Sequence, residues 1–180
     1  MANLRLHDEM PGFRLPGIDD RVYDPAEFKE KGILIIIFSC NHCPYVQAYE
    51  ERIKDIQARY GSRGVQIIAI NPNDERQYPE DSFEEMKRRA AKQQFNFIYL
   101  RDETQETARI FGAEATPELY VFDQKRRLVY TGKIDDNWRE PERVQTKYLE
   151  DALNELLEGK EVSVPETYAV GCSIKWRIKN

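Results

Sequence analysis

Hydrophobic positions along the chain alternate between short apolar runs and stretches with apolar residues three or four positions apart. Residues 32–38 read GILIIIF and residues 65–70 read VQIIAI. Unbroken β-branched runs of this kind predict strands that are buried on both faces, as in a parallel sheet. Between these runs, apolar side chains recur with helical spacing from Val46 to Tyr60, which predicts an amphipathic helix. The first half of the chain therefore predicts a strand–helix–strand unit.

The second half of the chain continues with shorter elements. In chain order we predict a helix over about residues 81–93, a short strand at 98–100, a helix at 106–111, a hairpin of strands 119–122 and 128–130, and a last helix at about 146–157. Strands that alternate with helices in this way predict an α/β domain of three layers, in which helices flank a central sheet.

Composition narrows the class of protein. The chain has 180 residues, of which 41% are hydrophobic and 33% are charged, and this argues against a disordered or a membrane-spanning chain. We find no repeat and no linker rich in Gly, Ser or Pro, so we predict a single domain over residues 1–180. The net charge is −5 and the basic residues are scattered, so we expect no nucleic-acid partner.

Hydropathy and the first residues suggest a compartment. The longest apolar run, residues 33–38, is much too short to span a bilayer, so we expect no membrane partner. The first residues carry neither an apolar core nor a small-residue cleavage pattern typical of a secretory signal. We therefore expect a cytoplasmic protein.

The chain has three cysteines, an odd number that is too small for a disulfide framework. Cys40 and Cys43 enclose Asn41 and His42, whereas Cys172 lies far away near the end of the chain. In a reducing compartment, a close pair of this kind more often serves catalysis or metal binding than static cross-linking.

The chemistry concentrates where the first buried strand gives way to a helix. We expect Cys40 at the N-cap of that helix, where the first-turn N–H groups and the helix dipole would lower the pKa of its thiol. Cys43 lies one helical turn further on, so Cys40 could attack a substrate disulfide and Cys43 could resolve the mixed disulfide. His42 could place positive charge or a ring N–H near the Cys40 thiolate. The plainer alternative is that His42 is an exposed residue at the helix start.

Two other interpretations of the cysteines stay open. A CxxC can be half of a zinc site, but zinc takes about four ligands, and the remaining candidates are only His7, His42 and Cys172. We therefore expect no metal, and no cofactor beyond the redox-active disulfide itself. Cys172 could be a third redox thiol, or an inert thiol that is partly buried near the end of the chain.

Several motifs together resemble a known family. They are FSCNHCP at residues 38–44, ATPE at 115–118, PGFRLPG at 11–17, YTGKIDD at 130–136 and GCSIKW at 171–176. The first two resemble the thioredoxin superfamily, and the whole set resembles the peroxiredoxin-like group in its AhpC/TSA–redoxin branch. This resemblance implies a thioredoxin-like fold with a mixed sheet, a redoxin-type N-terminal extension over residues 1–30, an inserted helix and strand, and a C-terminal tail over residues 160–180.

The same resemblance assigns roles to residues. It implies a thiol–disulfide oxidoreductase in which Cys40 is the attacking thiol and Cys43 the resolving thiol. Pro117 would be a cis-proline opposite the pair, and Thr116 would present backbone groups to a substrate, with Asn41 as a second substrate-binding residue. The expected partners are protein or small-thiol disulfides and an unidentified thiol electron donor or acceptor.

The chain departs from the family pattern at three positions. Peroxiredoxins carry PxxxTxxC, and here Ile33 and Ile37 stand at the Pro and Thr positions. This weighs against a thiol peroxidase, which stays an alternative beside a non-catalytic metal-binding module. Leu34 stands where thioredoxin has a buried acid, so proton transfer near Cys43 would need another group. Water, His42 and Glu118 are the candidates.

Overall fold

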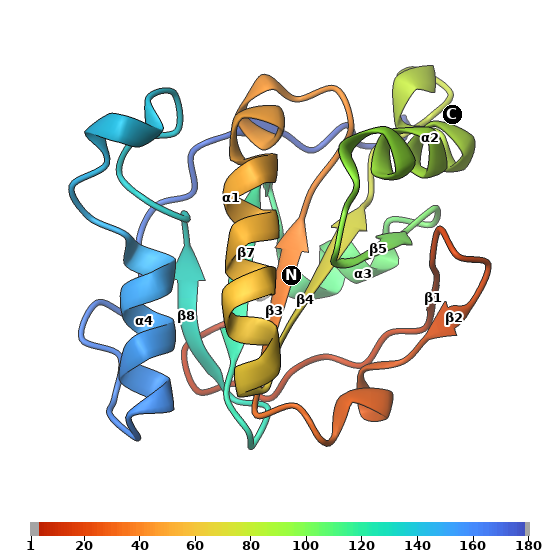
Figure 1. The fold of residues 1–180 in the computed structure, drawn as a ribbon. Helices are drawn as coiled ribbons and strands as arrows, with labels where there is room; N and C mark the ends of the chain where they lie inside the picture. Colours follow the sequence, from red (N-terminus) through yellow and green to blue (C-terminus); the bar gives the residue numbers. More distant parts are fainter. Residues whose placement is uncertain (1–3, 179–180) are drawn as a thin grey trace.

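A five-stranded mixed sheet carries the fold in the computed structural model, which describes residues 4–178 (Figure 1). The strand order is β5 (Ile98–Arg101), β4 (Val65–Asn71), β3 (Ile33–Phe38), β7 (Glu118–Phe122) and β8 (Leu128–Gly132). The first three strands are parallel, and β7 runs antiparallel to both β3 and β8. The two apolar runs thus form the centre of the sheet, and the predicted hairpin is confirmed.

In the described part of the chain, four α-helices cover this sheet. They are α1 (Pro44–Tyr60), α2 (Phe83–Gln93), α3 (Glu106–Phe111) and α4 (Tyr148–Leu157). The second begins two residues later than predicted, because Pro79–Asp81 forms a short 3-10 turn and the Ser82 side chain accepts the N–H of Glu85 as the helix cap. Further 3-10 turns lie at Pro25–Phe28, Gly61–Arg63 and Pro141–Arg143.

Successive side chains of β3 divide between two hydrophobic clusters. Ile35 and Ile37 pack with residues of α1, α2 and α4 on one face, whereas Ile36 and Phe38 pack with α3 on the other. In Figure 1, α1 lies in front of β3 and α3 lies behind the sheet. This alternation follows from the two-residue period of a strand and confirms the predicted three layers.

The two ends of the chain add small sheets at the margins of this core. In the predicted N-terminal extension, β1 (Leu15–Pro16) pairs with β2 (Val22–Tyr23). In the predicted tail, β9 (Cys172–Ser173) pairs antiparallel with β6 (Ala115–Thr116). The first three and last two residues of these predicted segments lie outside the described residues. Among helices within residues 4–178, none combines the length and the apolar character needed to cross a membrane.

The sheet fixes where chemistry can occur. β3 and its parallel neighbour β4 end at the same edge, and the backbone of Ser39 extends the pairing by donating to Ile70 O at 2.8 Å. The CxxC segment follows immediately. It therefore lies at the carboxyl end of the central strand, which is where sheets of this class bind ligands.

We expect the centre of β3 to dominate stability. Ile36 is fully buried, whereas Ile110 on α3 is 54% exposed. Replacing Ile36 by Ala should lower the free energy of unfolding by about 2–5 kcal/mol, because it leaves a cavity in a packed core. The matched Ile110→Ala variant should change it by less than about 0.5 kcal/mol. Urea unfolding measures both, and equal losses would contradict this account of the core.

Candidate active site

The segment that carries the two close cysteines is a turn before α1. Pro44 is the first helical residue, and Cys43 is the N-cap with extended backbone angles (φ −72°, ψ 122°). The prediction that Cys40 forms the N-cap is therefore wrong. Proline suits the first helical position and disfavours the helical conformation for the residue before it, so the helix cannot begin earlier. The N-terminus of α1 acts on Cys43 instead.

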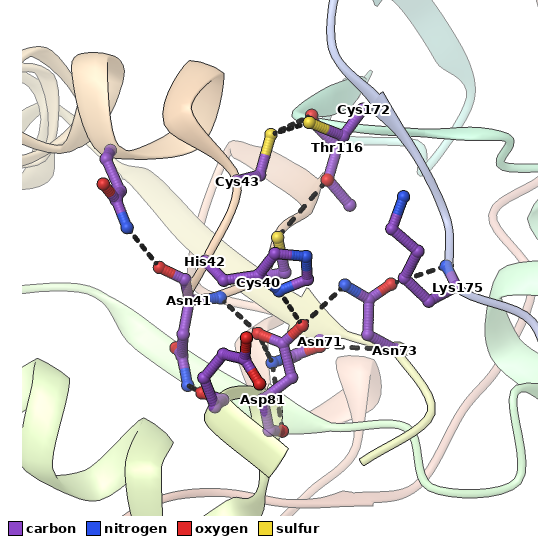
Figure 2. Close-up of polar contacts among 12 residues, drawn as sticks. Cys40, Asn41, His42, Cys43, Asn71, Asn73, Asp81, Thr116, Cys172 and Lys175 are labelled. Atoms are coloured by element: carbon purple, nitrogen blue, oxygen red, sulfur yellow. Dashed lines mark hydrogen bonds and ion pairs between the residues drawn. The ribbon is translucent and has the colours of Figure 1, made fainter. Parts of the chain in front are cut away.

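Three sulfur atoms gather around one threonine. Figure 2 shows the sulfurs of Cys40 and Cys43 pointing toward Thr116, and the sulfur of Cys172 facing that of Cys43. The Sγ atom of Cys43 lies 2.8 Å from Sγ of Cys172 and 3.3 Å from the carbonyl oxygen of Thr116. Cys40 Sγ lies 3.4 Å from the Thr116 hydroxyl oxygen. All three cysteines are free thiols; Cys40 and Cys43 are 2% and 0% exposed, and Cys172 is half-buried.

The surroundings of Cys40 and Cys43 move the pKa values of the two thiols in opposite directions. The adjacent Cys40 thiol is the largest cause that lowers the pKa of Cys43 to about 4, and hydrogen bonds from Cys172 and the Val46 N–H add to it. Sharing the proton with Cys43, then burial, then the Asp81 carboxylate raise the pKa of Cys40 well above its usual range. This reverses the expected order of the two thiols, because the helix terminus acts on Cys43 and the buried acid opposes charge on Cys40.

A buried carboxylate that we did not predict organises the turn. Asp81 is completely buried, and its Oδ2 atom lies 2.5 Å from Nδ1 of His42. Its Oδ1 atom accepts the N–H of Asn41 at 2.6 Å, and Oδ2 also accepts Nδ2–H of Asn73 at 2.8 Å. Sequence reasoning placed Asp81 at the start of a helix, since acids are common there, and nothing local pointed to a partner about 40 positions earlier.

His42 is held in place on two sides. Its ring stacks on Tyr78 with centroids 5.1 Å apart, and the contact between its Nδ1 atom and Asp81 fixes the orientation of the ring. One ring nitrogen of His42, the Cys40 sulfur and an Asp81 oxygen lie within 4.8 Å of one another. The ring therefore stands close enough to act on the Cys40 sulfur, although its tuning role stays a prediction.

The same three side chains form the one group with metal-ligand spacing in residues 4–178. Both oxygens of Asp81 already accept hydrogen bonds, from Asn41 and Asn73 among others, so a metal ion would have to displace these donors. His7, a zinc candidate from the sequence, lies beside Leu128 at the opposite end of the sheet. The arrangement suits a hydrogen-bonded pair of His42 and Asp81 better than a metal site.

The residues predicted to bind substrate lie at the site but are turned inward. Every polar group of Asn41 is hydrogen-bonded within the chain, to Asp81, Glu80, Gln47 and Tyr99. Thr116 is fully buried and pairs with Cys172 across β6 and β9. Substrate binding by these two residues stays a prediction.

The loop opposite the CxxC turn has the predicted backbone. The peptide bond between Thr116 and Pro117 is cis, as the resemblance implied. Glu118, a candidate for proton transfer, instead accepts the N–H groups of Glu114 and Ala115 and the hydroxyl of Tyr120. Its carboxylate braces this loop, which leaves His42 with Asp81 as the titratable pair beside the thiols.

Comparison with known proteins identifies the family. The Redoxin family model matches residues 5–149. The chain belongs to the Redoxin family. Residues after 149, including Cys172, lie outside the matched region. Among curated proteins, no match was found.

Some solved structures resemble this redoxin along nearly its whole length. An uncharacterized conserved protein from Geobacillus kaustophilus is 37% identical, with a TM-score of 0.92 over 98% of this chain and 95% of that chain. A hypothetical protein from Sinorhizobium meliloti 1021 is 31% identical, with a TM-score of 0.91 over 99% and 98% of the two chains. A thiol:disulfide interchange protein of the thioredoxin family from Chlorobium tepidum shares the fold at 19% identity, with a TM-score of 0.60 over 72% and 87%. The last structure shows the fold alone, and membership of the Redoxin family supports a thioredoxin-like redox function.

The pKa of Cys43 gives the reduced redoxin a defined pH dependence. Because the pKa of Cys43 is lowered from 9.0 to about 4, we expect a Cys43 thiolate in the folded protein between these pH values, and a protonated thiol in the unfolded chain. The unfolded state then binds more protons, so this contribution to the free energy of unfolding rises with pH and is lost as pH falls through about 4. Urea unfolding of reduced wild type and Cys43→Ser, across this range, should show a difference that grows with pH. Parallel profiles would place the charge elsewhere.

Asp81 should be needed for stability as well as for the geometry of the turn. In Asp81→Asn, an amide NH2 group replaces one of the two carboxylate oxygens. This NH2 group then faces N–H groups that now donate hydrogen bonds to that oxygen. Leaving buried donors unpaired should cost about 1–3 kcal/mol of unfolding free energy. The neighbouring Glu80→Gln variant changes an exposed side chain and is the matched control. Denaturant unfolding of both decides, and an Asp81→Asn protein as stable as the control would refute the role of this carboxylate.

Proposed function

We propose that this redoxin is a thiol–disulfide oxidoreductase that exchanges disulfides through Cys40 and Cys43. The observation that supports this most directly is the position of the pair in the fold. Two buried thiols lie beside the N-terminus of α1 and contact Thr116, whose peptide bond to Pro117 is cis, and these surroundings lower the pKa of Cys43. A reduced pair with one proton and one negative charge is prepared for nucleophilic exchange, since the thiolate is the reactive form.

The exchange can be written with all atoms assigned. Cys40 transfers its proton to the Cys43 thiolate and attacks one sulfur of a substrate disulfide, so that a bond from Cys40 to the substrate forms and the substrate S–S bond breaks. The released substrate thiolate takes the proton from Cys43. Cys43 then attacks Cys40 Sγ, which closes the Cys40–Cys43 disulfide and expels the second substrate sulfur as a thiolate. The substrate gains two electrons and the pair loses two.

The partners follow from this chemistry. The substrate is a protein or small-thiol disulfide, and a thiol donor returns the pair to the reduced form. In the opposite direction the oxidised pair would instead accept electrons from a dithiol. No cofactor beyond the disulfide takes part in either direction.

A thiol peroxidase is the second candidate function. The hydroxyl of Thr116 lies 3.4 Å from Cys40 Sγ, so it could orient a peroxide as the missing threonine of PxxxTxxC would. Against this, Ile37 at that motif position is fully buried in the core and supplies no hydroxyl. Peroxide consumption with a regenerating thiol tests this candidate directly.

Insulin-disulfide reduction by dithiothreitol tests the first proposal. Wild type should accelerate it, and Cys40→Ser should lower the rate to that of dithiothreitol alone, because the attacking sulfur is gone. Cys43→Ser should accumulate a mixed disulfide on Cys40 that mass spectrometry detects. The surface variant Ile110→Ala serves as the control and should match wild type. Full activity in Cys40→Ser would refute the proposal, and peroxide turnover without insulin reduction would favour the second candidate.

A further inference from the structure

We propose that Cys172 is a third working thiol of this redoxin, and that Cys43 moves its disulfide bond between Cys40 and Cys172. This inference rests on the exchange function proposed above and adds where the site meets its thiol partner. It starts from the position of the Cys172 sulfur, 2.8 Å from that of Cys43 although 129 positions separate the two residues. No heavy atom can lie between two sulfurs at that separation.

The backbone, and not chance flexibility of a tail, places Cys172 at the site. Cys172 pairs with Thr116 in the β6–β9 sheet. At the preceding position, a Cβ atom on Gly171 would lie only 2.1 Å from the Thr116 carbonyl oxygen. Glycine therefore permits a close approach that any other residue would block. The chain enters β9 directly beside the loop that faces the CxxC turn.

Contacts on the other side of Cys172 hold the tail just as firmly. Ile174 is buried, and its N–H donates to Glu114 O at 2.9 Å. Lys175 N–H donates to Oδ1 of Asn73 at 2.9 Å, and Lys175 O accepts from the N–H of Asp74 at 2.9 Å. A thiol fixed between such contacts loses little further conformational freedom when it bonds, so its effective concentration at Cys43 is high.

Cys172 is the outermost of the three thiols. Cys40 and Cys43 are buried, and Cys172 packs over them as the most exposed sulfur. A disulfide between Cys43 and Cys172 would therefore be easier for an external thiol to reach than one between Cys40 and Cys43. Cys172 is the natural point of contact with the thiol donor.

The transfer of the bond balances. Starting from the Cys40–Cys43 disulfide, Cys172 loses its proton and its sulfur attacks Cys43 Sγ. The bond from Cys43 to Cys172 forms, the bond from Cys40 to Cys43 breaks, and Cys40 leaves as a thiolate that takes up the proton. The oxidation state of the protein is unchanged. An external thiol, which is the reductant, then attacks Cys172 Sγ and expels the Cys43 thiolate, and a second external thiol frees Cys172 and forms the donor disulfide.

The environment of Cys43 favours this second half. A thiolate that its surroundings stabilise is a better leaving group, and the Cys40 thiol, followed by the Val46 N–H, lowers the pKa of Cys43. Burial, followed by the nearby Cys43, raises the pKa of Cys172 to about 11. Cys172 is therefore a poor leaving group. An external thiol that attacks Cys172 would form a mixed disulfide with it that persists.

Three variants with two cysteines each test the proposal. Each full-length variant is fully reduced, treated with excess oxidised glutathione, alkylated, and weighed by mass spectrometry. Cys40→Ser keeps the Cys43–Cys172 pair and should lose both free thiols without gaining glutathione mass, which marks an intramolecular disulfide. Cys43→Ser keeps Cys40 and Cys172, which the proposed transfer never joins in a disulfide, so it should gain glutathione or stay reduced. Cys172→Ser keeps the Cys40–Cys43 pair and should close that disulfide.

The outcomes separate this inference from the proposed function. If Cys172→Ser closes its disulfide and Cys40→Ser gains only glutathione, the third thiol is refuted and the exchange function stands. If Cys40→Ser closes and Cys172→Ser does not, the Cys40–Cys43 exchange fails while the Cys43–Cys172 contact stands. The wild-type protein is tested as well, because a result obtained without any substitution cannot be caused by a misfolded variant. Peptide mapping during its oxidation should find both linkages, and finding Cys40–Cys43 alone in every redox buffer would overturn the proposal.

Discussion

The buried carboxylate of Asp81 joins the three parts of the candidate site. It accepts hydrogen bonds from the backbone N–H of Asn41 inside the CxxC turn and from the side-chain amide of Asn73 after β4. It also contacts the ring nitrogen Nδ1 of His42. Asn73 in turn accepts the N–H of Lys175 in the tail that carries Cys172. Figure 2 shows this chain of contacts running from the turn to the tail. One acid therefore sets the positions of the cysteine pair and of the third thiol together.

Burying a charge in this way is costly unless donors surround it. A lone carboxylate in a protein interior would lose its hydration without compensation. Here amide donors from the backbone and from Asn73 replace water, and the ring nitrogen Nδ1 of His42 lies 2.5 Å from the carboxylate. A satisfied network of this kind is rigid, because removing any one member leaves another unpaired. That rigidity explains how a turn between a strand and a helix can hold two thiols in a fixed relation.

Local pattern was enough to predict the scaffold and not enough to predict the site. The β-branched runs identify β3 and β4, and the helical spacing after Cys43 identifies α1, because both patterns repeat over several residues. The ATPE motif led to the cis bond before Pro117 only through the family resemblance. The roles of Asp81 and Cys172 depend on pairings with residues about 40 and 129 positions away. No periodicity records such pairings, and β9 is two residues long, too short to leave a pattern.

The N-cap of α1 is Cys43 and not Cys40 as predicted, and this difference has the largest consequence for the chemistry. With Cys40 at the N-cap, the helix would stabilise the attacking thiolate, and Cys43 would only resolve. With Cys43 at the N-cap, the Cys40 thiol and the start of the helix lower the pKa of the middle sulfur, which lies between Cys40 and Cys172. A central sulfur must act in turn as nucleophile and as leaving group. Lowering the pKa of this sulfur makes it a better leaving group. The same change weakens it less as a nucleophile, since nucleophilicity falls only partly with pKa. The start of α1 at Pro44 thus suits a site in which the disulfide moves, more than one in which a single thiol attacks.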